Sequence, residues 1–106
     1  MGMGIGINTQ KPDAGKIKGK QEPVALSVWF TSKGKVMPKM LKFQDEEGEL
    51  HTISHIHVSS SAKRNYCGIP TLEFECESVM AACQYSFRLL YYIERQEWKI
   101  IWKNSW

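Results

Sequence analysis

Residues 71–77 read Thr-Leu-Glu-Phe-Glu-Cys-Glu, and this stretch decides the fold class. Apolar side chains alternate here with glutamates, and a period of two places the two sets on opposite sides of an extended chain. This pattern is typical of a strand with one buried side and one side toward solvent. The buried set is predicted to be Leu72, Phe74 and Cys76, and the exposed set Glu73, Glu75 and Glu77.

Alternation on both sides of this stretch predicts six strands. They are residues 24–31, 36–44, 49–58, 71–77, 85–91 and 98–102. Turn-forming residues separate several of them, and residues 59–70 are predicted as a loop. Pro38 cannot donate to a ladder, so its strand should lie at an edge or carry a bulge. Residues 78–84 are ambiguous between a wide hairpin and a helix that continues through Leu90.

The connections between these strands are too short for the crossovers of a parallel sheet. We therefore predict an all-β fold, a small antiparallel six-stranded barrel or roll. A chain of 106 residues has room for one hydrophobic core, so residues 23–106 form a single predicted domain. Residues 1–22 are rich in Gly, Lys and polar residues and show neither period, which predicts a flexible basic tail.

The net charge of +3 is unevenly distributed along the chain. Residues 11–42 contain eight lysines and two acidic residues, whereas residues 45–106 contain nine acidic and six basic residues. A basic front can attract nucleic acid, an anionic surface, an acidic partner or the acidic half of a neighbouring copy. It can equally be a solvated tail followed by a lysine-lined edge strand that resists aggregation.

Three cysteines, Cys67, Cys76 and Cys83, occur without a Cys-x-x-Cys pair. An odd number of cysteines fits reduced thiols better than a disulfide framework or a zinc ribbon. The N-terminus lacks the pattern of a secretory signal, and no apolar run is long enough to span a bilayer. These features predict a cytoplasmic protein that makes no membrane contact.

Several sequence marks occur in a fixed order along the chain. They are a Val24-x-Leu-x-Val opening, Gly34 followed by Pro38, an Asp45–Gly48 hairpin, Ile53-x-x-Ile56, a Lys63-Arg64 loop and Trp98 in the last strand. In this order, over about residues 24–103, they resemble a loose group of short uncharacterised bacterial all-β proteins. The resemblance implies a compact β-fold in a bacterial cytosol and assigns no catalytic residue.

Histidines and glutamates are the residues that could carry chemistry. His55 and His57 have a spacing that lets two imidazoles meet one metal, with His51 nearby and Cys67 or Cys76 as a further ligand. Because no third and fourth ligands are defined by their spacing, we predict no metal and no cofactor. The glutamates of residues 71–77 lack the apolar pocket that would raise a carboxyl pKa for catalysis. We therefore predict that the chain is not an enzyme and takes no small-molecule substrate.

Aromatic residues give the better indication of function. Seven Trp and Tyr residues provide more ring surface than one small core can hide, namely Trp29, Trp98, Trp102, Trp106, Tyr66, Tyr91 and Tyr92. Exposed Trp and Tyr are typical of protein interfaces, and rings beside cations also bind single-stranded nucleic acid. We predict a protein-interaction or self-associating module, with a single-stranded nucleic-acid-binding small β-barrel as the alternative. The predicted binding surface comprises Lys33, Lys35, Lys39, Lys63, Arg64, Trp29, Tyr66 and Tyr92.

Overall fold

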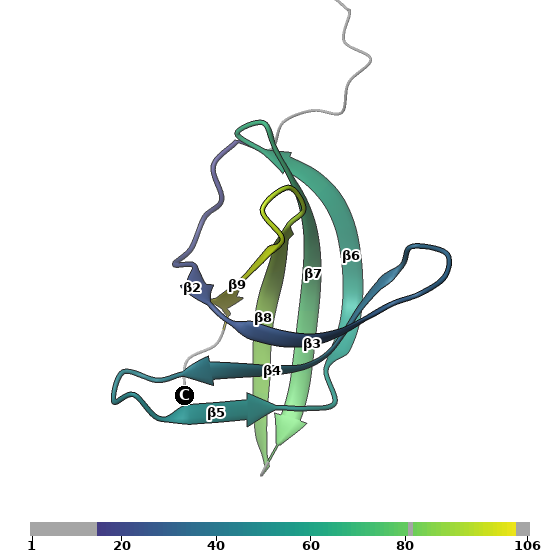
Figure 1. Cartoon of the computed structure of the whole chain (residues 1–106). Coiled ribbons are helices and arrows are strands. Elements are labelled where there is room, and N and C mark those ends of the chain that lie inside the picture. The colour runs from purple at the N-terminus through teal and green to yellow at the C-terminus, as the bar shows by residue number, and fades with distance from the viewer. Residues whose placement is uncertain (1–14, 81, 104–106) are drawn as a thin grey trace, which may run out of the picture.

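A computed structural model describes residues 15–80 and 82–103, so residues 1–14 of the predicted tail and Trp106 lie outside it. The described chain forms two antiparallel sheets, which confirms the predicted all-β class (Figure 1). None of the described residues belongs to a helix that is long and apolar enough to cross a membrane.

The larger sheet has the strand order β2-β9-β8-β7-β6. Its strands are β2 (Glu22–Pro23), β6 (His57–Tyr66), β7 (Ile69–Met80), β8 (Cys83–Tyr92) and β9 (Glu97–Trp102). The longest pairing joins β7 and β8, from Thr71 opposite Tyr92 to Met80 opposite Cys83. The stretch 71–77 therefore lies inside this sheet, beside its central strand β8.

The smaller sheet has three strands in chain order. They are β3 (Ala25–Phe30), β4 (Val36–Gln44) and β5 (Leu50–Ile53). The four residues of β5 pair with Leu41–Gln44, the second half of β4. Pairing of β3 with β4 skips Lys39, because Val28 faces Pro38 and Ser27 faces Met40. The bulge predicted for the strand that contains Pro38 is thus confirmed.

The smaller sheet covers one face of the larger sheet, and its strands run across those beneath (Figure 1). Between the sheets lies the main core, formed by Leu41, Ile53, Phe74, Cys76, Phe87, Leu89 and Ile100. Burial, with a smaller contribution from Glu75, raises the pKa of the Cys76 thiol to about 12. Trp98 packs at the border of this core, with ring centroids 5.7 Å from Phe74 and 4.7 Å from Tyr91.

Residues 15–21 cover the opposite face of the larger sheet. Ile17 packs on a second buried cluster that consists of Tyr66, Leu90 and Ile101. The hydroxyl of Tyr92 donates a hydrogen bond to Gln21. The part of the predicted tail that the structure describes therefore contacts the sheet from Ile17 onward.

Four details of the sequence prediction are corrected. The two sheets stay open instead of closing into a barrel, and the described residues form eight strands where six are predicted. Residues 59–66 of the predicted loop belong to β6, whose side chains are mostly polar on both faces and therefore hide its period. The predicted strand 49–58 breaks before His57, where His55 adopts a positive φ of 54°.

The region 78–84 follows the hairpin alternative. β7 continues to Met80 and β8 begins at Cys83, with Ala82 at a positive φ of 65°. Cross-strand pairing here extends to the last residues before the turn. The described residues of this region contain no helix, so the helical alternative is wrong.

We expect Trp98→Ala to lower the free energy of unfolding by about 3 kcal/mol, because it opens a cavity beside Phe74 and Tyr91. Trp29→Ala is the matched control: its side chain is 63% exposed, so the expected loss is below about 1 kcal/mol. Urea unfolding followed by circular dichroism measures both values. Equal losses would contradict the placement of Trp98 at the core.

We also expect Gly19→Ala to destabilise the fold more than Gly15→Ala. Both glycines have a positive φ, 106° and 78°, so alanine costs about 1–2 kcal/mol of backbone strain at each position. A Cβ on Gly19 would also lie 2.9 Å from Cγ2 of Ile101, whereas one on Gly15 meets nothing within 4 Å. This clash should add at least about 1 kcal/mol in urea unfolding. Identical effects would show that residues 15–21 do not pack on the sheet.

Candidate functional site

Two open strand edges face each other on one side of the molecule. β6 is the last strand of the larger sheet and, among the described strands, pairs with β7 alone. The first half of β4, residues 36–39, has no described ladder partner on the side where β5 covers the second half. The hairpin between β3 and β4 carries this half past the outer edge of β6 (Figure 1).

A groove lies between these two edges, and we call it the β4–β6 groove. It consists of two hollows of about 410 and 310 Å³ that share Lys35, Val36, Ser61 and Phe74. Its walls are residues 34–39 and residues 56–63, and Leu72 and Phe74 complete the lining. This space is large enough to hold several side chains of a bound segment.

The sequence of β6 keeps the groove open. Ser59, Ser60 and Ser61 are exposed and have short side chains, so they fill little of the space between the two edges. Pairing with β7 shifts register between Val58 and Ser60, and the Ser59 hydroxyl donates to the carbonyl of Glu75. Apolar atoms of Val36, Val58 and Phe74 remain accessible between the polar walls.

The charged side chains of the groove are all basic. Lys35, Lys39 and Lys63 line it together with His57, and the lining contains no carboxylate. Within the described residues these lysines form no ion pair. Lys39 places its Nζ 4.8 Å from the centroid of the Trp29 ring, so this cation has an aromatic partner.

Two large hydrophobic side chains lie exposed at the end of β3. Trp29 is 63% and Phe30 62% exposed, next to the hairpin that leads into β4. Phe30 lies opposite Val36, and its ring centroid is 6.5 Å from that of Tyr91. Exposed rings are typical of binding surfaces, but neither ring lines the groove itself.

The other face of the larger sheet carries a network of paired charges. Glu73 is 7% exposed; its carboxylate accepts hydrogen bonds from Tyr66 at 2.6 Å and from Arg64 at 3.0 Å. Glu75 accepts hydrogen bonds of 2.6 Å from both Arg88 and Lys103. The prediction that these glutamates are solvated on the exposed face is therefore wrong for Glu73 and Glu75, because cations from β6 and β8 and Lys103, which follows β9, neutralise them.

The network shifts the pKa values of several of its members, among them Tyr66 and Glu75. Burial and the hydrogen bond to Glu73 raise the pKa of Tyr66 to about 12. Burial alone would raise the pKa of Glu75, but the hydrogen bonds from Lys103 and Arg88 outweigh it and leave the pKa below its usual range. Glu75 thus adds stability above its ordinary pKa, and this contribution is lost as the pH falls through the lowered value.

The structure divides the predicted binding surface between two faces. Lys35, Lys39 and Lys63 line the groove, with Lys33 in the adjoining hairpin and Trp29 beside Lys39. On the other face, Arg64 and Tyr66 bind Glu73, and Tyr92 binds Gln21. The two sets cannot form one continuous contact surface, since the larger sheet lies between them.

The three histidines do not share a face. His51 lies on β5, where its Nε2 is 2.7 Å from the Asp45 carboxylate, whereas His55 lies in the bend and His57 begins β6. Ligand atoms of Asp45, Glu49 and His51 approach one another within 4.8 Å at the exposed β4–β5 hairpin. The His51 hydrogen bond and the backbone N–H groups of the hairpin lower the pKa of Asp45. The Asp45 carboxylate therefore already stabilises the turn through its hydrogen bonds.

A hollow of about 430 Å³ adjoins residues 15–21, and its charged lining residues are Lys16, Arg95 and Lys99. The guanidinium of Arg95 already lies over the Tyr92 ring at 4.9 Å and pairs with Glu97 at 3.5 Å.

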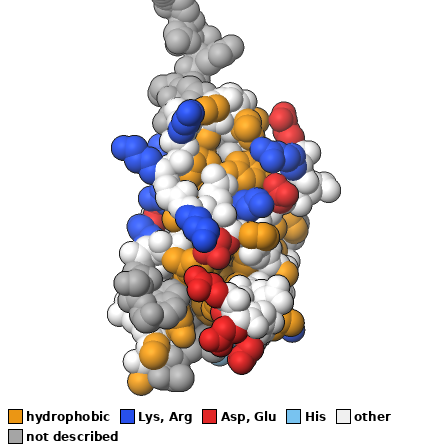
Figure 2. All heavy atoms as spheres, turned by 90° about the vertical axis from the view of Figure 1, so that its left-hand side faces the viewer, with side chains coloured by type: hydrophobic (Ala, Val, Ile, Leu, Met, Phe, Trp, Pro, Cys, Tyr) orange, Lys and Arg blue, Asp and Glu red, His pale blue; other side chains and the backbone are white. Residues whose placement is uncertain are grey.

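Figure 2 shows one face of the molecule, on which basic side chains gather mainly in the upper part and acidic ones in the lower part.

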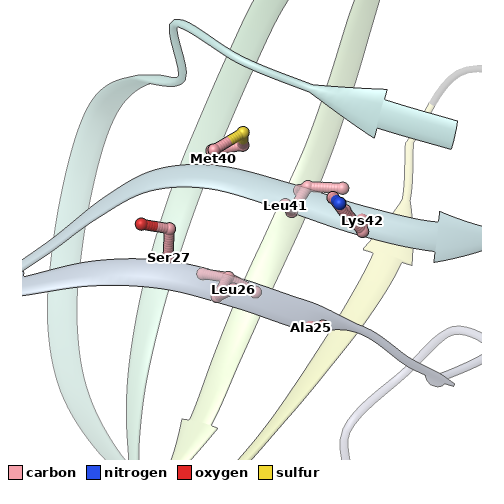
Figure 3. Close-up of a pocket in the computed structure, with 6 residues that line it drawn as sticks. All are labelled: Ala25, Leu26, Ser27, Met40, Leu41 and Lys42. Carbon is pink, nitrogen blue, oxygen red and sulfur yellow. The ribbon is translucent and has the colours of Figure 1, made fainter.

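Another hollow lies on the smaller sheet itself (Figure 3). It is lined by Ala25, Leu26, Ser27, Met40, Leu41 and Lys42, which come from two paired strands, β3 and β4. Its volume of about 200 Å³ lies below the usual range for small-molecule sites, roughly 300–1,000 Å³. We therefore regard it as a depression that accompanies the bulge at Lys39.

No family model, curated protein or solved structure matches this chain. The functional interpretation consequently depends on the geometry described above.

Sequence reasoning missed the serine wall of the groove and the cations that pair with Glu73 and Glu75. The sequence contained one signal for β6, the glycine at position 68. Cys67 and Gly68 both have positive φ, 51° and 80°, and a glycine at the second central position is typical of a tight hairpin turn. A strand must precede such a turn. To predict that Arg88 pairs with Glu75, one must know the register between β7 and β8. The sequence left this register undefined, because residues 78–84 were ambiguous.

We expect Tyr66→Phe to lower the free energy of unfolding by about 1–2 kcal/mol at pH 7, because the buried Glu73 carboxylate loses a donor. Tyr91→Phe is the control and should change it by less than about 0.5 kcal/mol. The Tyr66 pKa of about 12 exceeds the ordinary value of about 10, so its stabilisation is complete below pH 10 and is lost as the pH rises from there.

The variant Tyr66→Phe should therefore lose less stability than the wild type on going above pH 10. Urea unfolding at pH 7 and at several alkaline pH values measures this difference. If the free energy of unfolding changed with pH in parallel for wild type and variant, Tyr66 would not keep its proton through the hydrogen bond to Glu73.

Proposed function

We propose that this chain is a non-enzymatic protein-binding module that takes an extended segment of another protein into the β4–β6 groove. The observation that carries the proposal is the ten-residue strand β6, whose outer edge faces the open half of β4 across an accessible space. A strand edge presents backbone N–H and C=O groups that can pair with a further strand. The apolar residues that line the groove add side-chain contacts to this backbone pairing.

Several features support binding over catalysis. Glu73 and Glu75, the carboxylates nearest to the sheet interior, are engaged by arginine, lysine and tyrosine partners. Trp29 and Phe30, near the hairpin between β3 and β4, offer exposed ring surface of the kind that anchors protein interfaces. A partner that covered both the groove and this hairpin would bury an edge strand and exposed aromatic surface.

Single-stranded nucleic-acid binding is the second candidate function. The contact between Lys39 and the exposed Trp29 ring favours it, together with the unpaired lysines of the groove. Bases stack on rings while cations neutralise phosphates. This alternative makes no use of the open edge of β6, which is why we favour a protein ligand.

A phage library of random decapeptides tests the proposal, with wild type and Ser61→Trp as baits. Ser61 lines both hollows of the groove, so a large ring there should block it, while the exposed edge strand tolerates an aromatic residue. Ser27→Trp, at an exposed position of β3 outside the groove, is the control. We expect peptides enriched on wild type and on Ser27→Trp and lost on Ser61→Trp.

Urea unfolding of both variants checks that each is folded. Sedimentation of the wild type and of Ser61→Trp shows whether a second copy uses the same groove. Absence of enrichment on the wild type, together with a monomer in sedimentation, would contradict the proposed function. Equal enrichment on all three baits would place the binding site elsewhere.

A further inference from the structure

We infer that the partner of the β4–β6 groove is an acidic extended segment, which adds to the edge of β6 as a further strand with carboxylates near Lys35, Lys39 and Lys63. This inference rests on the proposed function, since it identifies the chemistry of the segment that the groove binds. It assigns a ligand class to lysines that otherwise lack a counter-charge.

The cations beside Glu73 and Glu75 form ion pairs, whereas the lysines of the groove form none within the described residues. On the face opposite the groove, Arg64, Arg88 and Lys103 all form ion pairs with Glu73 or Glu75, at 2.6–3.6 Å. In the groove, three lysines face no carboxylate of the lining. Complementary charge from a partner would satisfy them and would exclude basic segments through like-charge repulsion. The same charges would accelerate association with an acidic partner at low salt.

The positions of the groove lysines set the spacing of the acidic residues in the bound segment. Lys39 and His57 line one hollow, Lys63 lines the other, and Lys35 lines both. From His57 to Lys63 a strand rises about 3.3 Å per residue, so the groove spans roughly 20 Å. A segment of about seven residues fills this length, with at least one carboxylate toward each end.

Strand addition also decides where the apolar residues of the partner lie. Side chains of an added strand alternate between its two faces. One set would point into the space between the sheets, where Val36, Val58 and Phe74 provide apolar contact. The other set would face outward. The expected ligand is therefore an alternating apolar and acidic sequence, whereas a nucleic acid would satisfy the lysines but leave the backbone edge of β6 unpaired.

The chain itself offers one acidic segment as a competitor. Residues 1–14 contain one lysine and one aspartate, so they lack the required charge. The β4–β5 hairpin, residues 45–49, carries four acidic residues and could approach the groove of a second copy. Its Asp45 is already bonded to backbone N–H groups of the turn and to His51, so the hairpin is held in a bent shape that does not match an extended strand.

Three labelled decapeptides and one thymidine oligonucleotide test the inference by fluorescence anisotropy at near-physiological salt, about 0.15 M. The peptides alternate Val with Glu, Val with Thr, or Val with Lys. We expect the Val-Glu peptide to bind about tenfold more tightly than the Val-Thr peptide, with an affinity that falls as salt rises. Hydrogen exchange of residues 57–66 should slow when the Val-Glu peptide binds, because an added strand protects the outer amides of β6.

The double variant Lys35→Glu/Lys63→Glu should lose about tenfold in affinity for the Val-Glu peptide. The control Lys20→Glu/Lys42→Glu changes the net charge equally at exposed positions outside the groove and should lose little. Equal loss in both would mean a general charge effect and would overturn the inference.

The remaining outcomes separate the inference from the proposed function. Equal binding of the Val-Glu and Val-Thr peptides, with protection of β6, would overturn the acidic preference and leave the protein-binding groove intact. Absence of peptide binding with tight oligonucleotide binding would overturn both. A dimer that dissociates in the variant Glu46→Lys/Glu47→Lys would identify the hairpin of a second copy as the occupant and would overturn the extended acidic partner.

Discussion

Strand β8 is buried on both of its faces, and the rest of the structure depends on this constraint. Phe87 and Leu89 point toward the smaller sheet, while Leu90 and Tyr92 point away from it, and all four are at most 5% exposed. A strand that is apolar on both sides needs a cover over each face. The smaller sheet supplies one cover and residues 15–21 supply the other. Neither cover pairs with the outer edge of β6.

Electrostatics follows the same division. Glu73 is nearly buried beneath one cover, and a carboxylate in such a position must be matched by donors and cations. Arg64, Tyr66 and Arg88 satisfy this requirement from the neighbouring strands. Lysines on the groove side lie in a more exposed environment, where solvation stabilises an unpaired cation. The fold thus pairs its most buried carboxylates with cations and leaves the lysines of the groove without an ion pair among the described residues.

The sequence predicts the strands that have one buried face, because alternation marks them directly. Residues 36–44 and 71–77 belong to this class, and the bulge at Pro38 followed from its missing N–H donor. β6 could not be found in this way, since its side chains are mostly polar on both faces and it owes its extended shape to pairing with β7. The groove depends on that strand, so its wall escaped prediction although Lys35, Lys39 and Lys63 were singled out. Ion pairs across β7 and β8 depend on register, which local patterns do not define.

The cover formed by residues 15–21 has a consequence for the order in which the molecule folds. Tyr92 and Gln21 are bonded across a separation of 71 residues, and Ile17 packs on Ile101 of the last strand. The hairpins from β6 to β9 are local and can form early, whereas contacts of high sequence separation are slow to close. During synthesis, residues 15–21 leave the ribosome well before β9, and they must wait for β9 before they have a surface to cover. Until then one apolar face of the nascent sheet remains exposed, which makes this interval the stage at which misassociation or chaperone capture would occur.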